Sequence, residues 1–182
     1  DAYVVDARAP VQAGPGCVST SATRGSCAKP AAPIGYATLY GSGGDDELTL
    51  GSGFPDPGVV VLAGGHGSDA LRGADGAEIL IGGPSGADRL DAGGGDDALF
   101  SGPGGDALMG GDGSDQLVTS APCAGHDFSG GGGAGDIAGF GQTLDRGVVA
   151  KLGGPAFDPA DPSCRPTTVR GVSTQMGTAT VP

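Results

Sequence analysis

The stretch GGDGSDQLV, residues 110–118, places three glycines before the carboxylate of Asp115, and a leucine two residues after it. Glycine is costly to order and adds nothing to a core, so a repeated use of it needs a reason. The template recurs upstream as GGHGSDALR, residues 64–72. From residue 64 to residue 118 the chain consists of six such nine-residue units, with one insertion at Pro84–Ser85. A fixed short period in a chain with 40 glycines among 182 residues predicts a solenoid of stacked units rather than disorder.

One leucine recurs in the same slot of successive units. The members of this column are Leu62, Leu71, Leu80, Leu90, Leu99, Leu108 and Leu117. Because side chains alternate along a strand, this slot faces inward while its two neighbours face outward. Each buried leucine contributes roughly 1.5–3 kcal/mol. The core is thin, with 4% aromatic residues and no Trp, so we expect a further source of stability.

A carboxylate occupies a second fixed slot, two residues before the leucine. The acids in this slot are Asp46, Asp69, Glu78, Asp88, Asp97, Asp106 and Asp115. Coils stacked at strand spacing bring successive acids to about 5 Å, where like charges repel by ~3 kcal/mol at an effective dielectric of 20. A calcium ion between coils turns this repulsion into a net attraction, because it binds 6–8 oxygens, from carboxylates and carbonyls. The alternative is a metal-free glycine solenoid with solvated acids.

The glycines are expected to supply the remaining oxygens. Glycine accepts positive φ and close approach, so a turn built from it can aim several carbonyls at one point. The candidate carbonyl donors lie near Gly64, Gly65, Gly67, Gly82, Gly83, Gly110, Gly111 and Gly113.

These repeats resemble the glycine- and aspartate-rich nonapeptide of RTX proteins, G-G-x-G-x-D-x-U-x. The resemblance covers about residues 41–118, with a decayed continuation to about residue 140. It implies an all-β fold, a right-handed parallel β-roll or β-solenoid, in which two nonapeptides form one coil. It also implies several calcium ions, held between coils along each edge of the roll.

Carried over residue by residue, the resemblance divides the acids between two edges. One edge is lined by Asp46, Asp69, Asp88 and Asp106, and the other by Glu78, Asp97 and Asp115. Val60 stands where an acid belongs and is expected to abolish one site. We expect Glu78 to weaken a second site, and the insertion at Pro84–Ser85 to distort a third. Asp127 and Asp136 are weaker candidate ligands, because the register after residue 118 is ambiguous.

The flanks of the repeats predict β-structured caps. We expect one compact all-β unit, with an N-terminal cap at 1–40, the roll at 41–140 and a C-terminal cap at 141–182. Valine and threonine in both flanks favour strands, and the open ends of a solenoid need covering. No segment has a helical period free of glycine and proline.

Charge and cysteines indicate a calcium-rich, oxidising compartment. The net charge of −12 argues against nucleic acid and anionic membranes as partners. Four cysteines allow two disulfides, for which we expect Cys17–Cys27 and Cys123–Cys164; free thiols are the alternative. The chain contains no signal peptide or membrane span, so we expect a mature secreted protein, extracellular or at the cell surface, whose leader was removed.

Catalysis finds little support in the motifs. The chain has no G-x-S-x-G, H-E-x-x-H or Walker lysine, and His66 and His126 are interpreted as solvent-facing turn residues. We therefore expect a protein that is not an enzyme and has a structural role outside the cell. One candidate is a subunit of a filament or surface layer, whose copies associate end to end. The alternative is a monomeric, calcium-dependent adhesion or repeat module of a larger secreted protein.

Overall fold

The computed structural model describes residues 2–6, 17–19, 24–28, 36–50, 58–121, 123–141, 163–172 and 174–177. All sixteen elements in these residues are β-strands. No helix in this part of the chain is long and apolar enough to cross a membrane.

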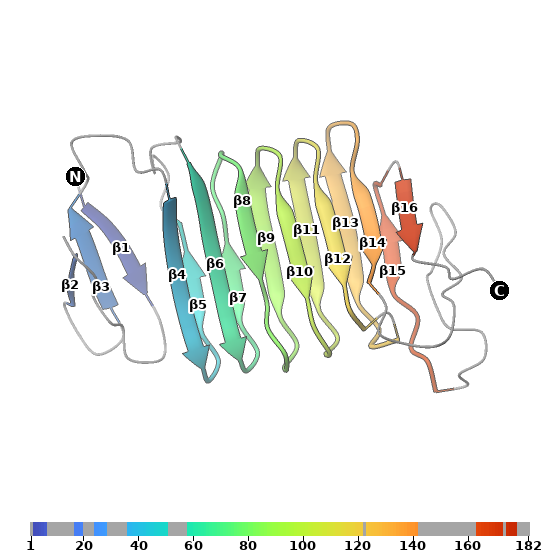
Figure 1. The fold of residues 1–182 in the computed structure, drawn as a ribbon, viewed down its shortest axis with the longest axis horizontal. Helices are drawn as coiled ribbons and strands as arrows, with labels where there is room; N and C mark the ends of the chain where they lie inside the picture. Colours follow the sequence, from blue (N-terminus) through green and yellow to red (C-terminus); the bar gives the residue numbers. More distant parts are fainter. Residues whose placement is uncertain are drawn as a thin grey trace.

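Two parallel sheets form the body of the molecule (Figure 1). The seven-stranded sheet contains β4 (Tyr36–Gly43), β6 (Val59–His66), β8 (Glu78–Ile81), β10 (Ala98–Ser101), β12 (Gln116–Thr119), β14 (Ile137–Phe140) and β16 (Thr174–Gly177). The six-stranded sheet contains β5 (Glu47–Thr49), β7 (Ala70–Arg72), β9 (Arg89–Gly94), β11 (Ala107–Asp112), β13 (Asp127–Gly132) and β15 (Thr168–Arg170). The chain alternates between the sheets, so each strand pairs with the strand two elements later. This is the predicted parallel β-solenoid.

The leucine column is the core between the sheets. The strand register aligns Leu62 with Leu80, Leu80 with Leu99 and Leu99 with Leu117 in the seven-stranded sheet. The equivalent row in the six-stranded sheet consists of Leu48, Leu71, Leu90, Leu108, Phe128 and Val169. All these leucines are buried, as the period-two alternation predicted.

Both flanks contribute strands. β1 (Ala2–Asp6), β2 (Cys17–Ser19) and β3 (Arg24–Ala28) form an antiparallel sheet in the order β1-β3-β2, and β1 contacts β5. β4 begins at Tyr36, inside the flank assigned to the N-terminal cap, and β15 and β16 lie in the flank assigned to the C-terminal cap. These three strands extend the two sheets of the roll, which is therefore longer than residues 41–140.

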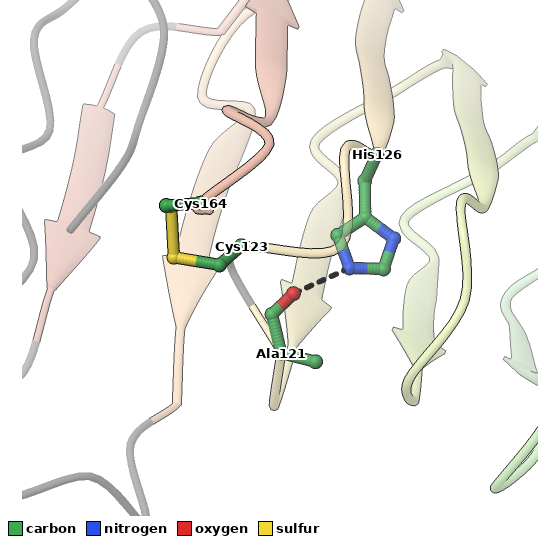
Figure 2. The surroundings of a disulfide bond; sticks show 4 residues. All are labelled: Ala121, Cys123, His126 and Cys164. Atoms are coloured by element: carbon green, nitrogen blue, oxygen red, sulfur yellow. Dashed lines mark hydrogen bonds between the residues drawn. A yellow bond between two sulfur atoms is a disulfide. The ribbon is translucent and has the colours of Figure 1, made fainter. Parts of the chain in front are cut away.

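A disulfide joins Cys123 to Cys164, with their Cα atoms 4.5 Å apart (Figure 2). It links the segment before β13 to the segment before β15, where Arg165 N–H also donates to the Cys123 carbonyl at 3.0 Å. In the N-terminal sheet the register sets Cys17 opposite Cys27. The side chains of that second predicted pair lie outside the described residues.

Candidate metal-binding site

A ladder of carboxylates runs along one edge of the roll, just before the strands of the six-stranded sheet. Asp46 N–H donates to Asp69 Oδ1 at 2.8 Å, and Asp69 N–H donates to Asp88 Oδ1 at 2.9 Å. Asp88 N–H donates to Asp106 Oδ1 at 2.9 Å. All four side chains are buried. Asp69, Asp88 and Asp106 therefore each bind the backbone of the coil before them through one oxygen.

A second ladder runs along the other edge, before the strands of the seven-stranded sheet. Glu78 N–H donates to Asp97 Oδ1 at 2.7 Å, and Asp97 N–H donates to Asp115 Oδ1 at 3.0 Å. Asp115 N–H continues the ladder to Asp136 Oδ1 at 2.9 Å. The acids thus divide between the edges in the two groups that the repeat implied, and Asp136 joins the second.

The other carboxylate oxygen points back into the turn of its own repeat. A Cβ atom added to Gly64 would overlap Oδ2 of Asp69, and one added to Gly110 would overlap Oδ2 of Asp115. Oδ2 of Asp69, Asp97 and Asp115 is buried and has no hydrogen-bond partner among the described residues. Buried polar atoms without partners are rare in native proteins and call for a missing ligand. These oxygens are open donors for a cation.

The turns place backbone carbonyls beside these oxygens. Gly65 and Gly67 have φ of +111° and +129°, a region that L side chains avoid. A Cβ on Gly83 would overlap the carbonyl oxygen of Gly65, and one on Gly111 would overlap that of Gly93. The turn carbonyls of successive coils therefore stack along each edge, next to the acids. Only glycine allows this approach.

Burial and like charge raise the pKa values of the ladder acids. Burial, opposed by the hydrogen bond from Asp69 N–H and reinforced by the Asp106 and Asp69 charges, raises the pKa of Asp88 to about 6. Burial, opposed by the bond from Glu78 N–H and reinforced by the Glu78 and Asp115 charges, raises the pKa of Asp97 to about 7. The pKa values of Asp69 and Asp115 are raised for the same reason, burial first. Without a cation, the edges disfavour their own negative charge.

This donor set fits calcium. Calcium prefers hard oxygen ligands, carboxylates and carbonyls alike, and accepts irregular geometry. Within residues 36–50, 58–121, 123–141 and 163–172, no three His, Cys, Asp or Glu side chains cluster closely enough to bind a metal alone. Backbone carbonyls or waters would therefore complete a coordination shell, and the stacked glycine turns present carbonyls.

His126 takes the place of the fifth acid in the first ladder. Asp106 N–H lies 3.1 Å from His126 Nδ1. In the preceding coil the equivalent backbone N–H, that of Asp88, donates to the carboxylate of Asp106. His126 Nε2 lies 2.8 Å from the Ala121 carbonyl, which can only accept, so Nε2 carries a proton (Figure 2), while Nδ1 also lies 3.2 Å from Asp106 Oδ2. Thr119 Oγ1 lies 3.0 Å from the same Nε2. The imidazole is 1% exposed, so the interpretation of His126 as a solvent-facing turn residue was wrong.

Asp127 therefore lies one residue beyond the ladder. It is the first residue of β13, aligns with Ala107, and forms an ion pair with Arg170 at 2.7 Å on the outer face. The sequence contains the signal that identifies the right residue, because the buried side chain always follows the ladder position by two. Phe128 fills that apolar position, which makes residue 126 the equivalent of the acids.

Three irregularities in the repeat have structural outcomes. The insertion at Pro84–Ser85 lies in the turn, where Ser85 Oγ is 3.0 Å from Nδ1 of the exposed His66, and the ladder from Asp69 to Asp88 is unbroken. The hydrogen bond between the two coils is therefore kept across the insertion, and the expected effect on a calcium site stays a prediction. Glu78 reaches back into its own turn, where Oε2 accepts from Ala74 N–H at 3.1 Å. Val60 is buried and aligns with Glu78 of the next coil, so a valine stands where the second ladder would have its first acid. The second ladder therefore begins one coil later than the first.

Comparison with protein families matches residues 38–54, 61–84 and 85–117 to the RTX calcium-binding nonapeptide repeat, four copies of it. Comparisons with curated proteins and with solved structures found no match. The matched segments carry most of the ladder acids and the glycine turns beside them. This chain therefore carries the RTX calcium-binding nonapeptide repeat, folded as a parallel β-solenoid.

Proposed function

We propose that this protein is a secreted β-roll that folds around calcium and serves a structural role outside the cell. The observation that supports this most is the pair of carboxylate ladders, in which one oxygen of an acid such as Asp69 or Asp115 holds the backbone of the preceding coil while the other faces the glycine turn. The proposal assigns no catalytic residue.

The ladders divide the edges into six gaps between consecutive acids. On the first edge the gaps lie between Asp46, Asp69, Asp88 and Asp106. On the second edge they lie between Glu78, Asp97, Asp115 and Asp136. Bound calcium would supply positive charge that offsets the repulsion between successive acids, and the turn carbonyls would complete its shell. The gap between Asp106 and His126 is excluded, because the imidazole replaces the second carboxylate.

This arrangement couples metal binding to folding. The acids converge only when coils stack, so the unfolded chain has no preformed site and the binding free energy becomes folding free energy. A net charge of −12 and a disulfide are both consistent with calcium-rich, oxidising surroundings.

Circular dichroism in calcium and in EGTA tests the proposal. We expect chelation to remove β-structure or to lower the melting temperature, and calcium to restore it. Magnesium is the control, since it requires near-ideal octahedral geometry and keeps its waters. A spectrum and melting temperature unchanged by EGTA would contradict calcium-coupled folding.

A narrower proposal is that copies associate end to end, in a filament or surface layer. It is supported by the outermost positions of β4 and β16 in the seven-stranded sheet, because an outer strand with a free edge is a template for pairing. The alternative is a monomeric calcium-dependent adhesion or repeat module of a larger secreted protein. Negative-stain microscopy in calcium separates them: open polymers support the filament, and isolated particles support the module.

A further inference from the structure

The outward side chains of the two sheets differ in kind. The five large hydrophobic side chains that are exposed within the described residues all belong to the seven-stranded sheet: Tyr36, Tyr40, Val59, Ile81 and Phe100. Tyr36 is 63% exposed and Tyr40 is 72% exposed. We call the outward side of β4, β6, β8, β10, β12 and β14 the apolar face.

The apolar face carries no ionisable charge over its central strands. Its strand segments 36–40, 59–63, 79–81, 98–100, 116–118 and 137–139 contain no Asp, Glu, Lys, Arg or His. The register joins Tyr40, Ala63, Ile81, Phe100 and Val118 into one continuous outward row across five strands. A row of this kind is a contiguous patch rather than scattered exposure.

The opposite face shows what a solvent-facing surface of this roll looks like. The outward positions of the six-stranded sheet hold ion pairs between Arg72 and Asp91 at 3.0 Å and between Arg170 and Asp127 at 2.7 Å. Arg89 and Met109 lie beside each other on the same face. The two faces arise from alternate nonapeptides of one repeat, so the difference between them is not imposed by the fold.

The exposed area of the patch lies in the upper part of the range found for the largest apolar patch of a monomer. With roughly 150–250 Å² for an aromatic side chain, the five exposed residues leave on the order of 500 Å² of apolar area uncovered. The largest patch on a typical monomer is about 300–600 Å² and is often functional. An area on the order of 500 Å² is more than half of the roughly 800 Å² that each partner contributes to a standard interface.

We propose that the apolar face binds a second copy of this chain, face to face about a twofold axis. A twofold interface needs one surface that is compatible with itself, and an uncharged sheet face meets that condition. The opposite face is a poorer surface for this contact, because the charged groups of its ion pairs would lose water on burial. Aromatic anchors such as Tyr40 and Phe100 are the residues that dominate interfaces energetically.

Sedimentation velocity of the calcium-loaded full chain, over a wide range of protein concentration, tests this proposal. We expect a monomer–dimer equilibrium. Phe100→Glu puts a charge on the apolar face and should weaken the dimer at least about tenfold. Met109→Glu is the matched control, because Met109 holds the equivalent outward position in the next nonapeptide and lies on the opposite face; it should leave the dimer unchanged.

Two results would overturn the proposal. One is a dimer insensitive to Phe100→Glu, and the other is a monomer at every concentration, including one whose Tyr fluorescence is shielded from acrylamide. Such shielding would mean that another part of the chain covers the apolar face. Calcium-dependent melting is measured on every variant in parallel. A folded monomer whose melting temperature rises with calcium refutes only the dimer. A wild-type chain whose melting temperature does not change with calcium refutes the proposed function instead.

Discussion

Asp97 uses its two carboxylate oxygens differently. Oδ1 accepts a hydrogen bond from Glu78 N–H at 2.7 Å, while Oδ2 is buried without a hydrogen-bond partner in the described part of the chain. An amide in this position keeps an oxygen for the backbone and loses the charge that a cation needs. Substitution by asparagine therefore separates the structural part of the residue from its electrostatic part.

Asp97 borders two gaps of the second ladder, so we expect Asp97→Asn to destabilise the calcium-loaded protein by about 2.7 kcal/mol for each ion lost, the contribution of one ion present at 100 times its Kd. In EGTA the same change should leave the melting temperature equal or higher, because it removes a buried like charge. Asp112→Asn is the control, since Asp112 is exposed and lies outside the ladders. Equal losses for Asp97→Asn in calcium and in EGTA would show a packing role only.

His126 ends the first ladder with an imidazole in place of a carboxylate. Its Nδ1 lies 3.1 Å from Asp106 N and 3.2 Å from Asp106 Oδ2, and its Nε2–H faces the Ala121 carbonyl, so no second carboxylate faces Asp106 at this step. We expect His126→Asp to bind one more calcium ion per chain and to melt lower than wild type in EGTA. Isothermal titration calorimetry measures the stoichiometry, with His66→Asp in an exposed turn as the control. An unchanged stoichiometry for His126→Asp would count against an equivalent site at this position.

At the scale of the element, the turns depend on glycine for two separate reasons. Gly113 has φ of +139°, and a Cβ there would also overlap the carbonyl oxygen of Gly95 in the preceding coil. Gly44 has φ of +104° with open space around its Cβ position. Substitutions at Gly44 and Gly113 therefore separate the cost of backbone strain from the cost of crowding between coils.

We expect Gly44→Ala to cost about 1 kcal/mol, the strain of positive φ alone. Gly113→Ala should cost about 1–3 kcal/mol more, because the added methyl forces the coils apart. Thermal melts of both variants in calcium measure the difference. If the two variants have the same melting temperature, the close approach of the coils at Gly113 adds no cost beyond that of positive φ.

The elements that could be predicted are those that obey the period. The leucine column, the strands around it and the ladder positions from Asp46 to Asp115 follow from spacing alone, because each unit makes the same contacts with its neighbours. The period fails after residue 118, where coil length changes: Asp106 is 20 residues before His126, whereas Asp88 is 18 before Asp106. Extra turn residues there hid the position of His126. The apolar face was not predicted either. It becomes visible only when the outward residues of alternate nonapeptides are grouped by the sheet to which they belong.

At the scale of the whole molecule, the ladder acids couple stability to pH. Burial raises the pKa of Asp88 to about 6 and that of Asp97 to about 7, against about 4 for an unfolded aspartate. A raised pKa in the folded state gives stabilisation that is complete below the unfolded pKa and is lost as pH rises through the folded pKa. The metal-free roll should therefore melt progressively lower between pH about 4 and pH about 7.

Calcium should reverse this trend. Protons and calcium compete for the same carboxylates, so affinity rises as the acids ionise, through pH about 6 to 7. Melting curves in EGTA and in calcium across this range test both slopes, and Asp97→Asn should flatten each of them near pH 7. Parallel slopes in EGTA and in calcium would contradict competition at the ladders.

The alternation of the chain between two sheets also restricts how such a gene can change length. Duplication of a single nonapeptide would move every later repeat to the opposite sheet, so Phe100 would join the charged face and Met109 the apolar one. The two ladders would exchange members as well, and His126 would then terminate the wrong edge. Duplication or loss of two nonapeptides preserves both faces and both edges. Length variation among descendants of this sequence is thus expected in whole coils, with odd residues accommodated in the turns as at Pro84–Ser85.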